Sequence, residues 1–343
     1  MSIQEVARIA SVSPSTVSRY LNGTLVLKGD TKQRVDGALQ DTGYVHRPRP
    51  KKAVPVKRSV VGVVVPELTN PYFAILAEQI AAAADQQSVS TVVFSAMNLP
   101  GNETPYVELA RRLKLDGLLY VGSTVRNDAL EKAMKAGFPV VVVDEPQELS
   151  LESHTVFQDD YSGAFQAVSY LAGQGHREIG FVSGSSVMRT AQERLRAYSD
   201  VLRRHDIDPD AQFRGIGSFT EEYGATVMAQ IMASERRPTA VFVASDIIAV
   251  GLVVAARSMR VRIPTDLSVV GYDDIPAARH LSPPLTTVRS PLADMARAAV
   301  DLTIEVMKDQ DVRPRHVVVP AGMIIRESAE PPSTAQGRPD DSE

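Results

Sequence analysis

A run of polar side chains near the N-terminus could form hydrogen bonds with a partner. Four of its members are Ser15, Thr16, Ser18 and Arg19. Hydroxyl and guanidinium groups of this kind hydrogen-bond to phosphates and to the edges of DNA bases. Val17 stands among them, four residues before Leu21, which is the spacing of an apolar stripe on a short helix. The segment therefore predicts a helix whose remaining surface is polar.

Sequence motifs of enzymes are missing from the chain. There is no Gly-x-Ser-x-Gly, no His-Glu-x-x-His and no phosphate-binding loop, and the absence of cysteine excludes disulfides and thiolate chemistry. Gly215-Ile216-Gly217 begins a dinucleotide fingerprint but lacks the third glycine in register. The paired acids Asp159-Asp160 and Asp273-Asp274 would point in opposite directions on an extended chain, and no histidine accompanies them. No catalytic residue, metal or cofactor is therefore expected.

Charge divides the chain into two unequal parts. The 343 residues are 44% hydrophobic and 23% charged, which is typical of a globular protein of two or three domains. Residues 1–58 hold 11 Lys and Arg against 4 acids, a charge of +7, whereas the other 26 basic and 37 acidic residues give −11. A small basic head on an acidic body indicates a module that binds a polyanion, although a basic face that binds nothing would have the same charge.

Neither a membrane span nor a secretory signal is visible in the sequence. No run approaches the roughly 18 apolar residues that a span needs. The N-terminal residues lack a basic region followed by an apolar core. A cytoplasmic protein without a membrane partner is therefore expected.

Three short helices are predicted in the head. The first begins with a capping box formed by Ser2 and Glu5. The second has Ser13 as its N-cap and Pro14 at its first position, where the missing N–H costs nothing. The third spans about residues 31–42. Helical hairpins are common and most bind no DNA, but the basic charge and the polar second helix favour a helix-turn-helix that enters the major groove.

The signature of the head is a specific one. Val6-Ala7 is followed by the run Ala10-Ser11-Val12-Ser13-Pro14-Ser15-Thr16-Val17-Ser18-Arg19-Tyr20-Leu21-Asn22. This run resembles the DNA-binding head of the lac repressor/galactose repressor family of bacterial regulators. The resemblance implies that base contacts come from Pro14, Ser15 and Arg19. It implies that DNA-backbone contacts come from Ser13, Thr16, Asn22 and Tyr44.

Two positions of the head differ from the family pattern. Ser11 stands where the family usually has glycine. Lys28 stands where the family usually caps its third helix with serine, so Asp30 or Gly29 is expected to cap that helix here.

The linker, residues 46–59, also differs from the family pattern. It holds three prolines and six basic residues. The family usually has a hinge helix here, with a leucine that wedges into the minor groove. Ala53 occupies the place of that leucine, and Pro48 and Pro55 disfavour a helix. An extended tether that contacts phosphates non-specifically is therefore favoured over a leucine wedge.

Residues 60–327 alternate apolar runs with helical patterns. Strands buried on both faces of a parallel sheet are predicted at 60–65, 91–95, 118–121, 140–143, 179–183, 240–244 and 269–271. Helices are predicted at 72–85, 105–113, 129–135, 162–173, 190–204, 223–233 and 247–259. The pattern predicts a doubly wound α/β fold in two lobes. Lobe one spans about 60–158 and 288–318, and lobe two about 160–286 and 319–327. Residues 328–343 are predicted to be a disordered tail.

Motifs in this body extend the family resemblance over almost the whole chain. They are Asn70-Pro71-Tyr72-Phe73, Gly175-His176-Arg177, Val243-Ala244-Ser245-Asp246 and Gly271-Tyr272-Asp273-Asp274. The body resembles the family's periplasmic-binding-protein-like effector domain. The resemblance implies an effector site between the lobes, at Tyr72, Phe73, Ser123, Asp144, Arg194, Phe219, Asp246 and Asp273. Glu145 stands where the family often has arginine, so the pocket is expected to differ on that side.

Each of these positions also has a structural interpretation. Phe73 could belong to the core, and Asp144 and Asp246 could cap helices. Arg194 could be a surface ion-pair partner. His176 is expected to be a structural hydrogen-bonding residue and not a ligand-binding one.

The sequence predicts a ligand-responsive transcriptional regulator, a repressor that binds a pseudo-palindromic operator in double-stranded DNA as a homodimer. The family resemblance implies that its small-molecule effector is a sugar or a related metabolite. A tetramer is not expected, because residues 330–343 contain no Leu, Ile or Val for a heptad seam. The alternative is a cytoplasmic sugar-binding protein or a sugar-processing enzyme on the same two-lobed fold.

Overall fold

The structure is a computed structural model that describes residues 2–44, 58–99, 101–122, 126–309 and 311–333. The chain divides into two compact units, a head that ends at Lys57 and a body that begins at Arg58. The predicted linker lies outside the described residues up to Lys57, and so does Ser123.

The head contains the three predicted helices, α1 (Ile3–Ile9), α2 (Pro14–Leu21) and α3 (Gly29–Thr42). The Ser2 hydroxyl accepts a hydrogen bond from the Glu5 N–H at 3.4 Å, and the Ser13 hydroxyl accepts one from the Thr16 N–H at 3.1 Å. Val6, Ala7, Ala10, Val17, Val35 and Ala38 form the buried core. Both N-caps are therefore where the sequence predicts them.

Two backbone positions explain how the head departs from the family pattern. Ser11 has a φ of 51°, in the left-handed region that favours glycine, at the turn between α1 and α2. Helix α3 begins at Gly29, about two residues earlier than predicted, and Lys28 occupies the N-cap without a side-chain hydrogen bond. The expectation that Asp30 or Gly29 caps α3 was wrong, because both residues lie within the first turn. Asp30 instead places a negative charge near the positive end of the helix dipole.

Lobe one of the body is built on a six-stranded sheet in the order β11-β5-β4-β3-β1-β2, and all its neighbours pair in parallel. Its strands are β1 (Ser59–Val65), β2 (Val89–Ser95), β3 (Gly117–Tyr120), β4 (Val140–Val143), β5 (His154–Gln158) and β11 (His316–Val319). Helices α4 (Pro71–Gln86) and α11 (Leu292–Lys308) cover one face. Helices α5 (Glu103–Arg112) and α6 (Asp128–Lys135) cover the other. Val63 and Val64 of β1 consequently enter opposite cores, as expected for a strand buried on both faces.

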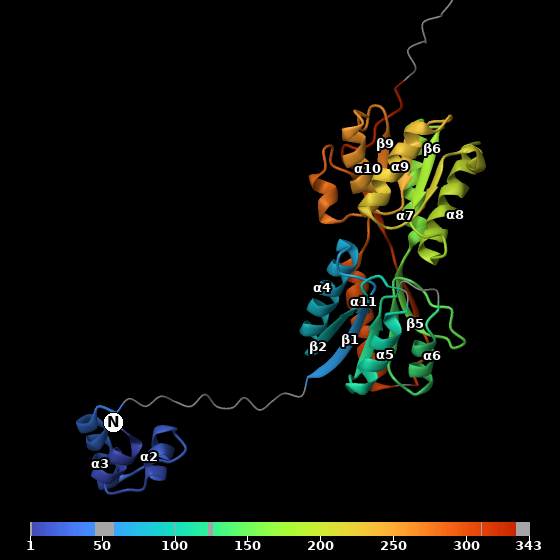
Figure 1. Ribbon diagram of the computed structural model, residues 1–343. Coiled ribbons are helices and arrows are strands. Elements are labelled where there is room, and N and C mark those ends of the chain that lie inside the picture. The colour runs from blue at the N-terminus through green and yellow to red at the C-terminus, as the bar shows by residue number, and fades with distance from the viewer. Residues whose placement is uncertain (1, 45–57, 100, 123–125, 310, 334–343) are drawn as a thin grey trace, which may run out of the picture. The chain divides into compact units, whose positions relative to one another are not determined.

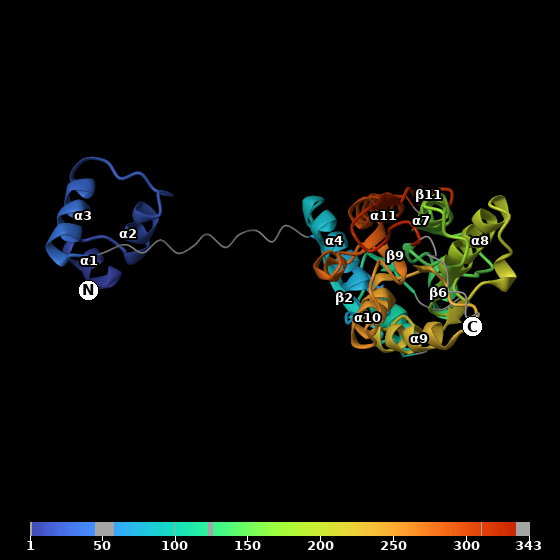
Figure 2. The ribbon, with the colours of Figure 1, turned by 90° about the horizontal axis from the view of Figure 1, so that it is seen from above.

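Lobe two repeats this architecture with the sheet order β12-β10-β9-β8-β6-β7, in which only the β10–β12 pair is antiparallel among the described strands. Its strands are β6 (Ile179–Ser183), β7 (Arg214–Ile216), β8 (Ala240–Val243), β9 (Ser268–Asp273), β10 (Thr286–Arg289) and β12 (Gly322–Ile324). Helices α7 (Asp160–Gly173) and α8 (Arg189–Arg204) cover one face, and α9 (Glu221–Ala233) and α10 (Asp246–Ser258) cover the other. Two short 3₁₀ helices, Pro209–Ala211 and Pro276–His280, complete the lobe. Figures 1 and 2 show the helix pairs of the lobes on their sheets.

The chain passes between the lobes three times, after β5, after β10 and after β11. The second passage follows Arg289, because β10 pairs with β9 in lobe two through that residue. The predicted boundary at residues 286–288 was therefore a few residues early. The sequence patterns also did not predict β5, β7, β10, β11, β12 or α11.

The predicted disordered tail begins too early, because Ser328 is buried between strands of lobe two. Its hydroxyl donates to the Val269 carbonyl at 2.6 Å and accepts from the Thr286 N–H at 2.8 Å. The Glu330 carbonyl accepts hydrogen bonds from Ser268 at 2.9 Å and from His176 Nε2 at 2.9 Å. The expected structural role of His176 is confirmed. Within the described residues, no helix is both long and apolar enough to cross a bilayer.

Candidate nucleic-acid interface and ligand cleft

The N-terminal turn of α2 presents a small hydroxyl network on the surface of the head. Ser13 Oγ lies 2.7 Å from Ser15 Oγ and 2.8 Å from Thr16 Oγ1, within hydrogen-bond distance of both. Ser13, Pro14 and Ser15 are exposed, and Thr16 is half-buried. The cap that starts the helix therefore also orders the hydroxyl groups that follow it.

Arg19 is the exposed cation of the same helix. Arg8 pairs with Glu5 at 2.7 Å, and Lys32 lies 3.9 Å from Asp36. In contrast, no side chain among the described residues hydrogen-bonds to or pairs with the Arg19 guanidinium. This group is available for an external acceptor, and guanidinium groups bind guanine edges or phosphates in a bidentate manner.

The other two predicted DNA-contacting residues are partly used within the head. Asn22 is exposed, but its side-chain amide donates to the Ser18 carbonyl at 2.7 Å and so caps the C-terminus of α2. Tyr44 follows the end of α3 and packs against the head core. It does not belong to α2, the helix that carries the hydroxyl network. The structure brings Ser13, Pro14, Ser15, Thr16 and Arg19 together on one helix.

In the body, a cavity of about 310 Å³ lies between the lobes. Six of the eight predicted effector residues line it: Tyr72, Phe73, Asp144, Arg194, Phe219 and Asp273. Sequence reasoning missed other polar lining residues, namely Glu67, Asn70, Asn98, Ser185, Thr190, Ser218 and Ser245. These residues follow strand ends or begin helices, so the shared position at the carboxyl edge of two parallel sheets is the signal that could have found them.

Asp246 does not belong to this cavity. Its carboxylate is fully buried and accepts hydrogen bonds from Thr287 Oγ1 at 2.7 Å and from the Ile275 N–H at 3.1 Å. It therefore joins α10 to β10 and to the segment after β9 inside lobe two. The predicted ligand-binding role of Asp246 is not supported, because both carboxylate oxygens are already occupied.

Helix α4 positions the aromatic side of the cleft. Asn70 accepts from the Tyr72 N–H at 3.1 Å as the N-cap, with Pro71 at the first helical position. Tyr72 is buried, and its hydroxyl donates to Asp144 Oδ1 at 2.5 Å. Its ring meets Phe73 edge-to-face, with the ring centroids 5.2 Å apart. The cap thus fixes two aromatic rings and one carboxylate at the same wall.

Arg194 is the centre of a buried charge network and not a surface ion-pair partner. Its Nε donates to Asp160 Oδ1 at 2.8 Å, and its Nη1 donates to the Ala244 carbonyl at 2.6 Å. Asp273 Oδ1 lies 4.0 Å from Nη1, and the guanidinium carbon stands 3.8 Å from the centre of the Tyr272 ring. The side chain is only 8% exposed, so these contacts lie in a region of low dielectric.

Burial raises the pKa values of the carboxyl groups in this network. Desolvation outweighs the hydrogen bond from Tyr72 and raises the pKa of Asp144 to about 6. Desolvation outweighs the charge of Arg194 and raises the pKa of Asp160 to about 6 and that of Asp273 to about 7. The cleft therefore offers carboxyl oxygens, one guanidinium and aromatic rings. These groups suit a ligand with several hydroxyl groups and an apolar face.

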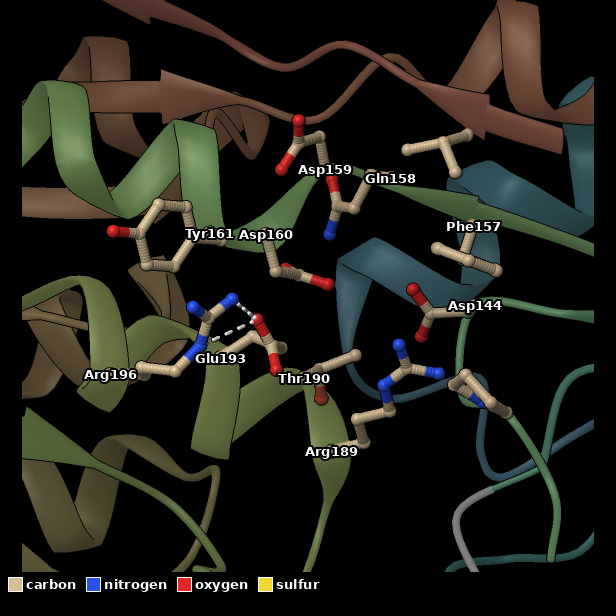
Figure 3. A pocket seen from close by; sticks show the side chains of 12 residues that line it. Asp144, Phe157, Gln158, Asp159, Asp160, Tyr161, Arg189, Thr190, Glu193 and Arg196 are labelled. Carbon is tan, nitrogen blue, oxygen red and sulfur yellow. Dashed lines mark hydrogen bonds and ion pairs between the residues drawn. The ribbon is translucent and has the colours of Figure 1, made fainter. Parts of the chain in front are cut away.

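A second cavity of about 230 Å³ lies beside the first passage between the lobes (Figure 3). Asp144 and Thr190 line both cavities. Gln158, at the end of β5, lines the second cavity and is 1% exposed, and its amide atoms have no hydrogen-bond partner among the described residues. Figure 3 also shows Arg196 paired with Glu193 at the rim. The sequence did not predict this cavity, since its walls come from β5, α7 and α8.

Glu145 connects the two lobes next to both cavities. Its carboxylate belongs to the segment after β4 in lobe one, and it accepts hydrogen bonds from the Arg189 N–H at 2.5 Å and the Thr190 N–H at 3.2 Å at the start of α8 in lobe two. Desolvation raises the pKa of this carboxyl group. Glu145 lines neither cavity itself, and the expected difference of the pocket on its side stays a prediction.

Two family models match the chain. Residues 2–46 match the model of bacterial regulatory proteins of the lacI family. Residues 168–329 match the model of the periplasmic binding protein-like domain.

Individual proteins are similar over most of the chain. The transcriptional repressor CytR of Escherichia coli K12 is 32% identical over 328 residues, which are 95% of each chain. A solved complex of the transcriptional regulator CelR with cellobiose is 28% identical and has a TM-score of 0.73, covering 96% of this chain and 100% of that one. A regulator from Enterococcus faecium with bound ribose is 26% identical, with a TM-score of 0.72 over 80% of this chain and 99% of that one.

Proposed function

The chain belongs to the lacI family of bacterial regulatory proteins, and from this premise we propose that it is a transcriptional repressor whose operator binding responds to a small polyhydroxylated effector. The head would bind the operator, and the cleft between the lobes would bind the effector. The body carries no catalytic motif in its sequence, and its relative CytR is a repressor. We therefore favour regulation over catalysis.

The observation that carries the DNA-binding part is the exposed face of α2. Ser13, Ser15 and Thr16 form one hydroxyl network, and Arg19 extends from the same helix without a partner among the described residues. A short helix with such a face fits the major groove, where its N-terminal residues contact base edges. Residues 1–58, which comprise the head, the linker and Arg58, carry a formal charge of +7, which favours a phosphate backbone as the target of the head.

The chemistry of the cleft supports a sugar or a related metabolite as the effector. Asp144 and Asp273 supply acceptors for hydroxyl groups, Arg194 supplies donors, and Phe73 and Phe219 offer faces for apolar C–H groups. Cellobiose and ribose are bound by two of the structurally similar regulators. A ligand that contacts both lobes would shift the population of lobe arrangements.

We propose further that the protein acts as a homodimer on a pseudo-palindromic operator in the bacterial cytoplasm. Two copies of the head would then read half-sites whose centres are about one DNA turn apart or a multiple of it. Coupling between cleft and head follows if the effector favours one arrangement of the lobes in both copies.

Selection of DNA fragments by the purified full-length protein tests this proposal. We expect enrichment of one pseudo-palindromic sequence, and fluorescence anisotropy should then show an affinity that falls steeply with salt. Sugars and nucleosides added to this complex should include at least one that changes the affinity. Failure to enrich any sequence would overturn the DNA-binding proposal, whereas an operator complex that no ligand changes would overturn only the effector part.

A further inference from the structure

Glu145, in lobe one, accepts hydrogen bonds from the N–H groups at the start of α8, a helix of lobe two. Helix α8 has Met188 at its N-cap, and this side chain makes no capping hydrogen bond. The Glu145 carboxylate, which is 1% exposed, instead receives the N–H groups of Arg189 and Thr190 at 2.5 and 3.2 Å. In most of the other helices of the body, the side chain of the N-cap residue accepts a hydrogen bond from the first turn. In α8, a carboxylate from the other lobe accepts these hydrogen bonds instead.

The same helix end forms part of the effector cleft. Met188, Thr190 and Arg194 all line the cavity of about 310 Å³. The unpaired N–H groups and the dipole at a helix N-terminus form a favourable place for an anion. In this cleft, a carboxylate of the protein already occupies that place.

The remaining charges of the cleft also disfavour an anionic ligand. Asp144 and Asp273 are buried and line this cavity. Asp160 is buried and lines the adjoining cavity of about 230 Å³, and Glu145 is buried directly after Asp144 in the chain. Arg194 is the only Arg or Lys that is buried among the described residues, and it already pairs with Asp160 at 2.7 Å. Of the residues that the structure describes along the wall of the cavity of about 310 Å³, Arg194 is also the only Arg or Lys, so a phosphate or carboxylate bound in that cavity would lose its water without gaining an unpaired cation from its lining.

We propose that Glu145 is a specificity-determining residue of the cleft, because it occupies the anion-binding end of α8 and so selects uncharged effectors over phosphorylated or carboxylated ones. This inference rests on the proposed function, in which the cleft binds the effector. It narrows the effector class to neutral hydroxylated molecules, such as free sugars or nucleosides. It also assigns Glu145 a second effect, since its two hydrogen bonds hold lobe one to lobe two without any ligand group.

The test uses inorganic phosphate as a probe, titrated by calorimetry into the full-length protein without DNA or effector. Glu145→Ala frees the two N–H groups, and we expect it to bind phosphate at least about tenfold more tightly than the wild-type protein. Glu148→Ala is the matched control, because Glu148 is an exposed carboxylate of the same segment. Both variants contain the unchanged basic head, so phosphate that binds to the head contributes equally to the two titrations.

Glu145→Gln separates the two contributions of the carboxylate. Its amide oxygen still accepts from α8, so we expect a smaller gain in phosphate affinity that comes only from the lost charge. If folded Glu145→Ala binds phosphate no better than Glu148→Ala, the proposal is overturned. If Glu145→Ala does not fold, equal phosphate affinity of Glu145→Gln and the wild type overturns it instead.

A second measurement compares effectors directly. For the effector found with the operator complex, we expect the wild type to reject the phosphorylated derivative by at least about tenfold, and Glu145→Ala to reject it less. Tighter binding of the phosphorylated derivative by the wild type would overturn the inference while leaving the proposed repressor function intact.

Discussion

The polar groups of the head come from one helix and are mostly exposed, whereas those of the cleft come from many segments and are mostly buried. In the head, Ser13 to Arg19 come from one short helix, and most of them are exposed. In the cleft, the lining extends from Pro66 to Asp273 along the chain, and three of its charged residues, Asp144, Arg194 and Asp273, are buried. The comparison teaches that a local, exposed site contributes little to the stability of its unit. A distributed, buried site is part of the core that holds its unit together.

Removing the central cation of the cleft should have the largest effect. Arg194→Ala leaves Asp160 without its ion-pair partner in a buried site, and we expect the free energy of unfolding of the body to fall by about 3–5 kcal/mol. Arg196→Ala, two positions along the same helix, is the control. Arg196 is 55% exposed, so its pair with Glu193 should contribute at most about 1 kcal/mol. Urea denaturation measures both variants, and equal losses would remove the contrast between buried and exposed charge.

The second prediction concerns how stability depends on pH. Burial, with a smaller contribution from the charge of Asp144, raises the folded-state pKa of Asp273 to about 7, and the charge of Arg194 opposes the rise. The folded body therefore binds this proton more tightly than the unfolded chain does. This contribution is fully present below about pH 4 and is lost as the pH rises to about 7. Each unit of pKa shift corresponds to about 1.4 kcal/mol.

We therefore expect the free energy of unfolding of the body to fall between pH 4 and 7, and Asp273→Asn to have a shallower slope. Chemical denaturation at several pH values measures both slopes. Parallel slopes for the variant and the wild type would show that Asp273 titrates normally. The head, whose described carboxylates are exposed or half-buried, should show no comparable loss over this range.

On the head, the expected losses concern binding more than folding. Arg19→Ala should weaken operator affinity by about 1–3 kcal/mol, since one base contact is lost, and should leave the stability of both units and effector binding unchanged. Arg8→Ala is the control, because Arg8 already pairs with Glu5 at 2.7 Å. Anisotropy titrations on the selected operator compare the two variants. An operator affinity of Arg19→Ala equal to that of the wild type would place the DNA interface on another face.

The smallest expected effect is at the cap of α2. Ser13→Ala removes the hydroxyl that accepts from the Thr16 N–H at 3.1 Å, and it should cost the head about 1 kcal/mol. Ser15→Ala removes a neighbouring hydroxyl without removing the cap and should cost less. Thermal unfolding of the full chain should show the head transition shifted and the body transition unchanged. A shift of the body transition would contradict the independence of the two units.

Prediction from the sequence succeeded where the signals are local. Ser13-Pro14 marks the start of α2, and apolar runs mark the central strands β1, β4 and β6. It failed for β5, whose two adjacent apolar residues Val156 and Phe157 form neither an alternation nor a long apolar run, and for the three-residue strands β7 and β12. Strands β7 and β12 lie at the edges of their sheet, and β5 lies between β4 and the distant β11. All three strands are stabilised by pairing with other segments, so their own residues carry little signal.

The sequence by itself determined the polar helix of the head, its caps and the residue types available to the cleft, because hydrogen bonds across three or four positions depend only on neighbouring residues. Only the tertiary structure decided between two aspartates with similar surroundings in the chain. Asp246 turns inward to Thr287, whereas Asp273 faces the cleft. It also placed Glu145 against the start of α8, whose residues Arg189 and Thr190 lie 44 and 45 positions further along the chain. The order of strands in the two sheets brings these distant residues together, and no local pattern encodes that order.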